Sequence, residues 1–246
     1  ETSIAVDAQG GLHAAYSIIT QDSTWIRYAT RPVGANQWTT SDLTEITGNI
    51  PQVPLAIDPQ GHLHIVYADG YPIPSIVHAE RPIGGGAWTK TIIASGGDGL
   101  SGGGAGERTD VAIDGVGGVH LTYSVTGMFN TTLGYAYRAP GGSFVTEVIE
   151  NSSTTHPWTS IALDGAGGVH VSYAHWNGLQ YATKPPGGAW STSYVAGGNY
   201  VESDIVVDPA GTVVWCADRR MFSFGPHTKS APDSVAGMTR QVGADS

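Results

Sequence analysis

The chain contains 246 residues with a net charge of −10, and 40% of its residues are hydrophobic while only 13% are charged. This apolar fraction is sufficient for a folded core and excludes an intrinsically disordered chain. The 11 Lys and Arg residues are scattered, which excludes nucleic acid as a main partner, and no apolar run reaches the roughly 18 residues of a membrane span.

A short apolar strand that ends in Asp occurs five times and defines a repeat. The five aspartates are Asp7, Asp58, Asp114, Asp164 and Asp208, at spacings of 51, 56, 50 and 44 residues. A Gly stands three positions after each of them. We expect the Asp side chain to accept hydrogen bonds from the backbone ahead, and the Gly to adopt a positive φ in a tight turn.

A second strand follows each turn and carries a recurring His and a recurring Tyr. The histidines are His13, His64, His120 and His170, and the tyrosines are Tyr16, Tyr67, Tyr123 and Tyr173. The fifth copy has Val214 and Ala217 in these positions. One His per repeat at the same depth predicts a ring of separated side chains, whereas zinc needs three or four ligands around one ion. We therefore interpret these histidines as buried and hydrogen-bonded between blades, and we predict no metal site and no cofactor.

Two further strands complete each repeat. The third strands are expected at Ile26–Thr30, Ile76–Glu80, Leu133–Tyr137, Leu179–Thr183 and Met221–Phe224. A Pro/Gly turn leads to a fourth strand that begins with an aromatic residue, namely Trp38, Trp88, Phe144 and Trp190, while the last copy near Met238–Val242 lacks one. We expect these aromatic side chains to fill the outer blade edges.

Four short strands in 40–50 residues match the size of a propeller blade. The sequence thus predicts an all-β fold, a five-bladed β-propeller with four antiparallel strands per blade, as one domain over residues 1–246. The blades are expected at about 3–46, 53–94, 109–150, 159–196 and 203–243. An open solenoid of five units is the alternative, and the absence of polar capping repeats disfavours it.

The phrase Ile4-Ala5-Val6-Asp7, with its following Gly, resembles blades of the NHL and BNR types over almost the whole chain. The chain lacks the Ser-x-Asp-x-Gly-x-x-Trp box of sialidases. In the fourth repeat, the segment from His156 to His175 is similar to BNR propellers of ulvan-lyase-type polysaccharide lyases. This resemblance implies a polysaccharide substrate and catalytic histidines.

Function is expected on the loops that join the second to the third strand and one blade to the next, because these loops vary while the others are short and repetitive. The predicted ligand-binding residues are Trp25, Tyr71, Phe129, Asn130, His156, Trp158, His175, Trp176, Asn177, Tyr200, Glu202 and Arg220. Aromatic rings among such polar groups suit a sugar, since rings stack on its CH face and polar groups bind its hydroxyls. A lectin-like, sugar-binding module is therefore favoured over an enzyme.

Two alternatives stay open. A polysaccharide lyase would use His156, His175, Tyr200 and Arg219 or Arg220 for β-elimination next to a uronate carboxylate. A glycosidase would need two carboxylates across one pocket, and no such pair is evident. The other alternative is a non-catalytic scaffold that presents its loops to a protein ligand.

Cys216 is the only cysteine in the sequence, so the chain cannot form an internal disulfide. The chain begins at Glu1 without a Met, from which we expect a processed protein that is secreted or at the cell surface. We expect it to be a monomer.

Overall fold

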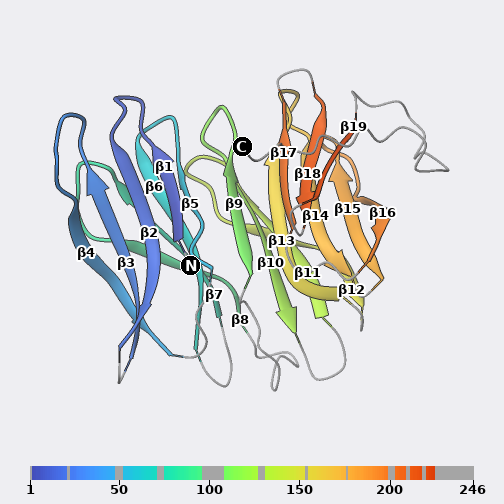
Figure 1. Cartoon of the computed structure of the whole chain (residues 1–246), viewed down its shortest axis with the longest axis horizontal. Helices are drawn as coiled ribbons and strands as arrows, with labels where there is room; N and C mark the ends of the chain where they lie inside the picture. The colour runs from blue at the N-terminus through green and yellow to red at the C-terminus, as the bar shows by residue number, and fades with distance from the viewer. Residues whose placement is uncertain are drawn as a thin grey trace, which may run out of the picture. The chain divides into compact units, whose positions relative to one another are not determined.

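The structure is a computed structural model that describes residues 2–20, 23–47, 52–70, 75–95, 108–126, 131–152, 155–175, 177–198, 203–208, 211–217 and 220–224. Every regular element in these ranges is a β-strand (Figure 1). With no helix in the described ranges, none there is long and apolar enough to cross a membrane.

The strands of the first two repeats are β1 (Thr2–Val6), β2 (Leu12–Ile19), β3 (Thr24–Arg31), β4 (Thr39–Ile46), β5 (Leu55–Ile57), β6 (His62–Asp69), β7 (Ser75–Pro82) and β8 (Thr89–Ser95). The third and fourth repeats form β9 (Thr109–Ile113), β10 (Val119–Thr126), β11 (Thr131–Arg138), β12 (Val145–Ser152), β13 (Thr155–Leu163), β14 (Val169–His175), β15 (Gly178–Lys184) and β16 (Ser191–Gly197). The fifth repeat forms β17 (Ser203–Val207), β18 (Val213–Ala217) and β19 (Arg220–Phe224).

Each repeat forms its own antiparallel sheet from strands that are consecutive in the chain. Four sheets have four strands each, and the fifth has the three strands β17, β18 and β19. The fourth strand expected near Met238–Val242 lies outside the described residues. The predicted third strands are confirmed to within two residues at each end. We number the sheets as blades one to five.

The turn after the first strand has the predicted chemistry. In blade one, the Oδ1 atom of Asp7 accepts hydrogen bonds from the backbone N–H groups of Gln9 (2.8 Å) and Gly11 (2.7 Å). Gly10 adopts a φ of 86°, a conformation that side chains with a Cβ resist. The equivalent aspartates in the other blades accept a backbone hydrogen bond over the same four-residue span.

The outer strand carries a bulge at the same place in each of the first four blades. The pairing of the third with the fourth strand shifts by one residue between Ile26 and Arg27, Ile76 and Val77, Leu133 and Gly134, and Leu179 and Gln180. A bulge adds twist and makes an edge strand a poorer template for pairing with another chain. The position of this bulge is therefore part of the repeat in the first four blades.

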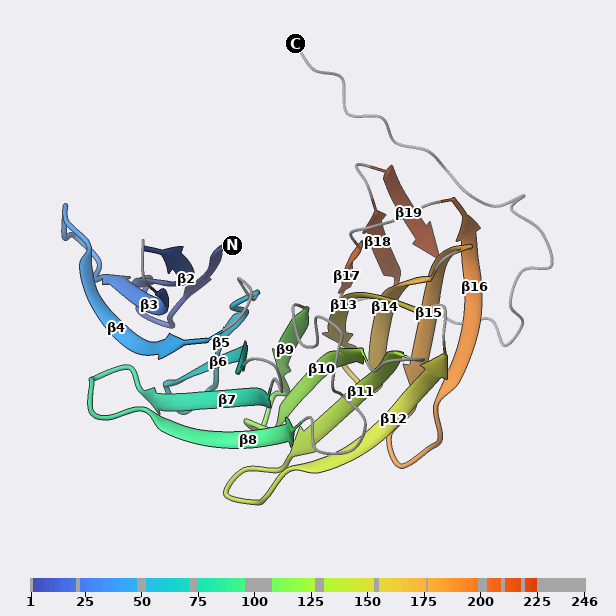
Figure 2. The same cartoon turned by 90° about the horizontal axis from the view of Figure 1, so that it is seen from below.

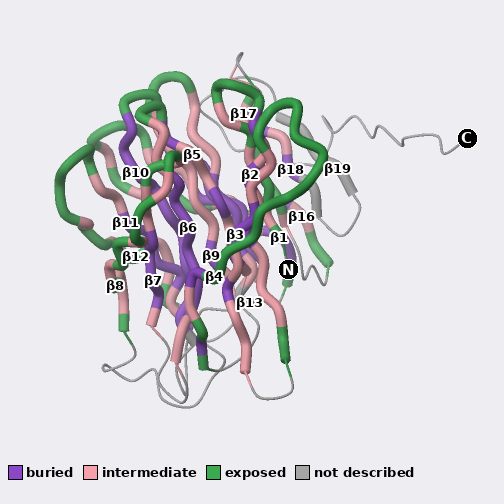
Figure 3. Tube along the Cα trace, turned by 90° about the vertical axis from the view of Figure 1, so that its left-hand side faces the viewer, coloured by how far each residue is buried: buried purple, intermediate pink, exposed green. Residues whose placement is uncertain are grey.

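Burial is concentrated in the second and third strands of the blades (Figure 3). Strand β14 is buried from Val169 to Ala174, whereas β4 and β8 are largely exposed or half-buried. One apolar cluster joins blade one to blade two, and another joins blade four to blade five. Tyr28 and Leu43 of blade one pack in one cluster with residues of blade two, and Trp215 of blade five packs with residues of blade four.

The contacts divide the chain into a first unit that ends at Pro157 and a second unit that begins at Trp158. Inside the first unit, β5–β8 and β9–β12 form successive sheets (Figure 2). In blades two and three, the aromatic residue before the fourth strand contacts the preceding blade, as expected for an edge-filling side chain. The ring of Trp88 lies 5.8 Å from Tyr28 of blade one, and that of Phe144 lies 5.1 Å from His78 of blade two.

Candidate functional site

Three of the four recurring histidines belong to a repeated Asp–His–Tyr arrangement. In blade one, His13 Nε2 lies 2.9 Å from Asp7 Oδ2, and His13 Nδ1 lies 2.6 Å from the hydroxyl of Tyr28. Blades three and four repeat it with Asp114–His120–Tyr135 and Asp164–His170–Tyr181. Because an ionised carboxylate only accepts, Nε2 carries the proton and Nδ1 accepts from the Tyr hydroxyl.

This arrangement corrects one expectation. These histidines are buried and hydrogen-bonded as expected, but their partners lie in their own blade and not in a neighbouring one, because the turn Asp and the third-strand Tyr flank the second strand. Burial lowers the pKa of His120, against the opposing effect of Asp114. The His120 imidazole is therefore neutral near pH 7. Its two hydrogen bonds, to Asp114 and Tyr135, connect the turn to the third strand.

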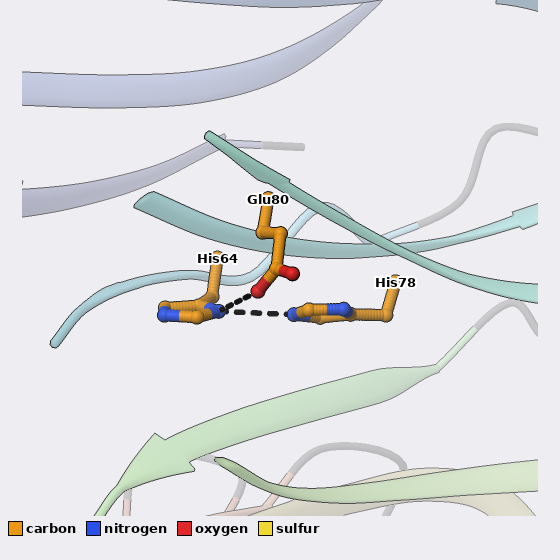
Figure 4. Close-up of side chains that lie close together, drawn as sticks. All are labelled: His64, His78 and Glu80. Carbon is orange, nitrogen blue, oxygen red and sulfur yellow. Dashed lines mark hydrogen bonds and ion pairs between the residues drawn. The ribbon is translucent and has the colours of Figure 1, made fainter. Parts of the chain in front are cut away.

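Blade two departs from the repeated arrangement because its third strand carries His78 where blades one, three and four carry Tyr. His64 Nδ1 lies 3.0 Å from His78 Nε2 and 3.6 Å from Glu80 Oε2 (Figure 4). His64 Nε2 lies 3.3 Å from Asp58 Oδ2. The recurring His of the second strands did not predict this cluster. The signal lies in the third strands, where His78 and Glu80 stand at the positions of Tyr and Thr in blades one and four.

The cluster in blade two lies in the interior. The side chains of His64 and His78 are about 1% and 0% exposed, while that of Glu80 is 26% exposed. Burial, then the neighbouring His64 and Arg138, lower the pKa of His78 to about 3. Arg138 of blade three donates two hydrogen bonds to the Glu80 carboxylate, and this pairing lowers the pKa of Glu80.

In the described residues, three of the side chains predicted to bind a ligand, Trp25, His175 and Asn177, lie at the end of a blade where the second strand passes into the third. We call this the variable end. Trp25 lies there at the start of β3, half-buried, and its Nε1 donates to Ser23 Oγ (2.8 Å). In blade four, His175 ends β14, and its Nδ1 lies 2.6 Å from Asn177 Oδ1. Since the amide oxygen accepts, Nδ1 carries the proton and the ring lone pair is on Nε2.

The first strand of blade four is longer than its counterparts. Strand β13 has 9 residues, whereas β1 has 5 and β5 has 3. His156 and Trp158, expected on a connection between blades, therefore lie in a strand, at its N-terminal part. Trp158 is half-buried.

The other predicted site residues are not described at the side-chain level. Tyr71, Phe129, Asn130, Trp176, Tyr200, Glu202 and Arg219 lie outside the described residues. Of His156 and Arg220 only the backbone is described, in β13 and β19. The structure thus brings together His175 and Asn177, and the proximity of His156 to His175 stays a prediction.

No protein-family model matches this sequence. No curated protein matches it either. Solved structures do: an α-L-arabinofuranosidase from Fusarium graminearum is 12% identical with a TM-score of 0.65, over 90% of this chain and 76% of its own. A lectin from Aleuria aurantia, solved with α-methyl-L-fucoside, is 11% identical with a TM-score of 0.64, over 92% of this chain and 75% of its own. The polysaccharide lyase Uly1 is 11% identical with a TM-score of 0.56, and the match covers 91% of this chain and 55% of the lyase chain.

These likenesses establish the fold class. The five antiparallel sheets, one per repeat, are the blades of a β-propeller, and the five-bladed, all-β prediction is confirmed.

Proposed function

We propose that the chain is a carbohydrate-binding propeller module that holds its ligand at the variable ends of its blades. The observation that carries the proposal is the composition of these ends. They present half-buried aromatic rings and the His175–Asn177 pair, whereas the opposite ends are built from repeated Asp–Gly turns. The solved structures similar in fold include lectins and carbohydrate-active enzymes, which supports the same class of ligand here.

The chemistry of blade four fits a sugar. Asn177 is exposed and hydrogen-bonded to His175, so its amide is held in one orientation. A fixed amide and an imidazole provide a donor and an acceptor for vicinal hydroxyls, and an indole such as Trp158 provides an apolar face for the CH side of the ring. The predicted loop residues Trp176, Tyr200 and Glu202 would complete this site.

Within this proposal the chain is of the BNR-like kind, it acts as a monomer, and it works outside the cell or at its surface. The extracellular placement rests on the class of ligand.

A glycan array with the labelled chain tests the proposal. We expect binding to a defined set of glycans, and a loss of about tenfold or more in affinity for Trp158→Ala and Asn177→Ala. Trp38→Ala is the matched control, because Trp38 is 41% exposed and lies before β4 at the opposite end of its blade. Equal loss in the control, or no glycan bound, contradicts the proposal.

One observation favours a second function, a polysaccharide lyase. The hydrogen bond to Asn177 orients His175 with its lone pair on Nε2, which is the form a general base needs to remove a proton next to a uronate carboxylate. Digestion of uronate-containing polysaccharides would then produce the ultraviolet absorbance of an unsaturated uronate. His175→Ala and His156→Ala should both abolish it. If no absorbance develops in this assay and no glycan is bound on the array, the protein-binding scaffold is favoured.

A further inference from the structure

We propose that His64, His78 and Glu80 form a zinc-binding site inside blade two. The three side chains come from two hydrogen-bonded neighbours, β6 and β7, whose register places His64 opposite Glu80 and Val66 opposite His78. One ligand atom from each lies within 4.8 Å of the other two. Figure 4 shows the His64 nitrogen facing both the His78 nitrogen and the Glu80 carboxylate.

The distances are close to those of a tetrahedral zinc site. With Zn–N and Zn–O bonds of about 2.0–2.1 Å, neighbouring ligand atoms lie about 3.3 Å apart. The two distances from His64 Nδ1, 3.0 Å to His78 Nε2 and 3.6 Å to Glu80 Oε2, lie on either side of this value. The ligand atoms of His78 and Glu80 lie within 4.8 Å of each other, so these two side chains would have to close around the ion, and two imidazoles with one carboxylate are ligands that suit zinc.

A carboxylate stands behind His64 for coordination. The Nε2 atom of His64 lies 3.3 Å from Asp58 Oδ2 but makes no hydrogen bond in the metal-free cluster, and an imidazole N–H that faces a carboxylate is the usual outer support of a metal-bound histidine. His64 Nδ1 then carries a lone pair directed at the cluster. Asp58 is itself held, since its Oδ1 accepts the backbone N–H of His62.

His78 supplies the independent observation. In the metal-free cluster, its Nε2–H donates to His64 Nδ1, and its Nδ1 is buried with no hydrogen-bond partner. A buried nitrogen without a partner is costly, because it has lost its hydrogen bonds to water and gained none in the protein. Zinc coordination at Nε2 places the proton on Nδ1, which stays buried in the same surroundings, and replaces the single histidine–histidine hydrogen bond by two metal bonds. The hydrogen bonds of the metal-free cluster thus leave His78 only partly satisfied, and the gain from an ion is at Nε2.

Only blade two has this set of ligands. In blades one, three and four, the residues equivalent to His78 are Tyr28, Tyr135 and Tyr181, and those equivalent to Glu80 are Thr30, Tyr137 and Thr183. Blade five has Met221 and Ser223 at these two positions. Two metal-binding side chains thus replace non-binding ones within three positions of a single strand. Glu80 is partly exposed, and we infer that an ion reaches the buried imidazoles past its side chain. Arg138 competes with the ion for the Glu80 carboxylate.

The test is a zinc titration of chelator-treated full-length chain in competition with a chromophoric chelator. We expect one tight equivalent of zinc and a melting temperature that rises with zinc concentration. Cobalt in place of zinc should give the intense visible absorption of tetrahedral coordination. His78→Tyr, which restores the residue of blades one, three and four, should abolish the tight equivalent, and Asp58→Asn should weaken it by roughly 10–100-fold.

His62→Ala is the matched control, because His62 also contacts Asp58 but is half-exposed and outside the cluster. It should leave the tight equivalent in place. If His78→Tyr does not fold, as judged by circular dichroism, Glu80→Gln provides the same comparison. The absence of tight zinc binding in the wild type, or unchanged binding in His78→Tyr or Glu80→Gln, overturns the proposal.

Discussion

The guanidinium carbon of Arg81, in blade two, lies 4.6 Å from the ring centre of Tyr28, in blade one. The same carbon lies 4.5 Å from the ring of Trp88, so Arg81 is held between two aromatic residues from successive blades. A cation also lies over the aromatic residue before the fourth strand in the other three blades that have one. This contact is therefore part of the repeat, and in blade two it joins neighbouring sheets.

We expect Arg81→Ala to lower the free energy of unfolding by about 1–2 kcal/mol, because the change removes two partly desolvated cation–π contacts. Urea unfolding followed by tryptophan fluorescence would measure it. Arg31→Ala is the comparison, since the described cation–π contact of Arg31 is with Trp38 of its own blade, which is 41% exposed, and the change should cost about 0.5–1 kcal/mol or less. Equal costs would show that the contact with Tyr28 contributes nothing.

The Asp–His–Tyr arrangement should be energetically coupled. Tyr135→Phe removes the hydroxyl that lies 2.7 Å from His120 Nδ1 and leaves a buried nitrogen unsatisfied. The expected loss is about 1–3 kcal/mol of unfolding free energy. His120→Val, which copies Val214 of blade five, combined with Tyr135→Phe in a double-mutant cycle should show a coupling of 0.5 kcal/mol or more. Strict additivity would contradict the arrangement.

Gly134 is required by close packing. A Cβ atom at this position would lie 2.4 Å from the ring of Tyr123, the residue paired with it across the strands. We expect Gly134→Ala to destabilise the chain by about 1–3 kcal/mol, because the ring has to move within a packed blade. Gly115→Ala, whose Cβ would meet nothing within 4 Å, should change stability by about 0.5 kcal/mol or less. Thermal unfolding of both variants makes the comparison.

Stability should fall as the pH is lowered from neutral. Burial lowers the pKa values of His64, His78 and His120 below their ordinary value of 6.5, in the case of His78 to about 3. Below pH 6.5 the unfolded chain therefore binds more protons than the folded one, and each such histidine decreases stability by at most about 1.4 kcal/mol per pH unit until its folded pKa is reached.

Urea unfolding with chelator present, at about pH 7.5 and about pH 5, checks this dependence. His78→Tyr removes one of the shifted groups, so its stability should change less between these two conditions. A wild-type chain that is equally stable at both would rule out neutral buried histidines.

The sequence alone was sufficient to predict the repeat, the tight turns and nearly every strand. These features depend on residues that are close in the sequence. Asp7 and Gly10 form their turn within four residues, and the apolar residues of each strand can be read within its own repeat. Repetition strengthened each inference, because all five copies have a Gly three positions after the Asp.

The tertiary structure decided which side chains meet. His64 and His78 are 14 residues apart and belong to different positions of the repeat, and only the register of β6 with β7 brings their nitrogens to 3.0 Å. Arg81 and Tyr28 meet because two sheets pack face to face, which no local pattern encodes. Side-chain contacts between strands depend on pairing register and on the packing of whole sheets, and both are properties of the folded chain.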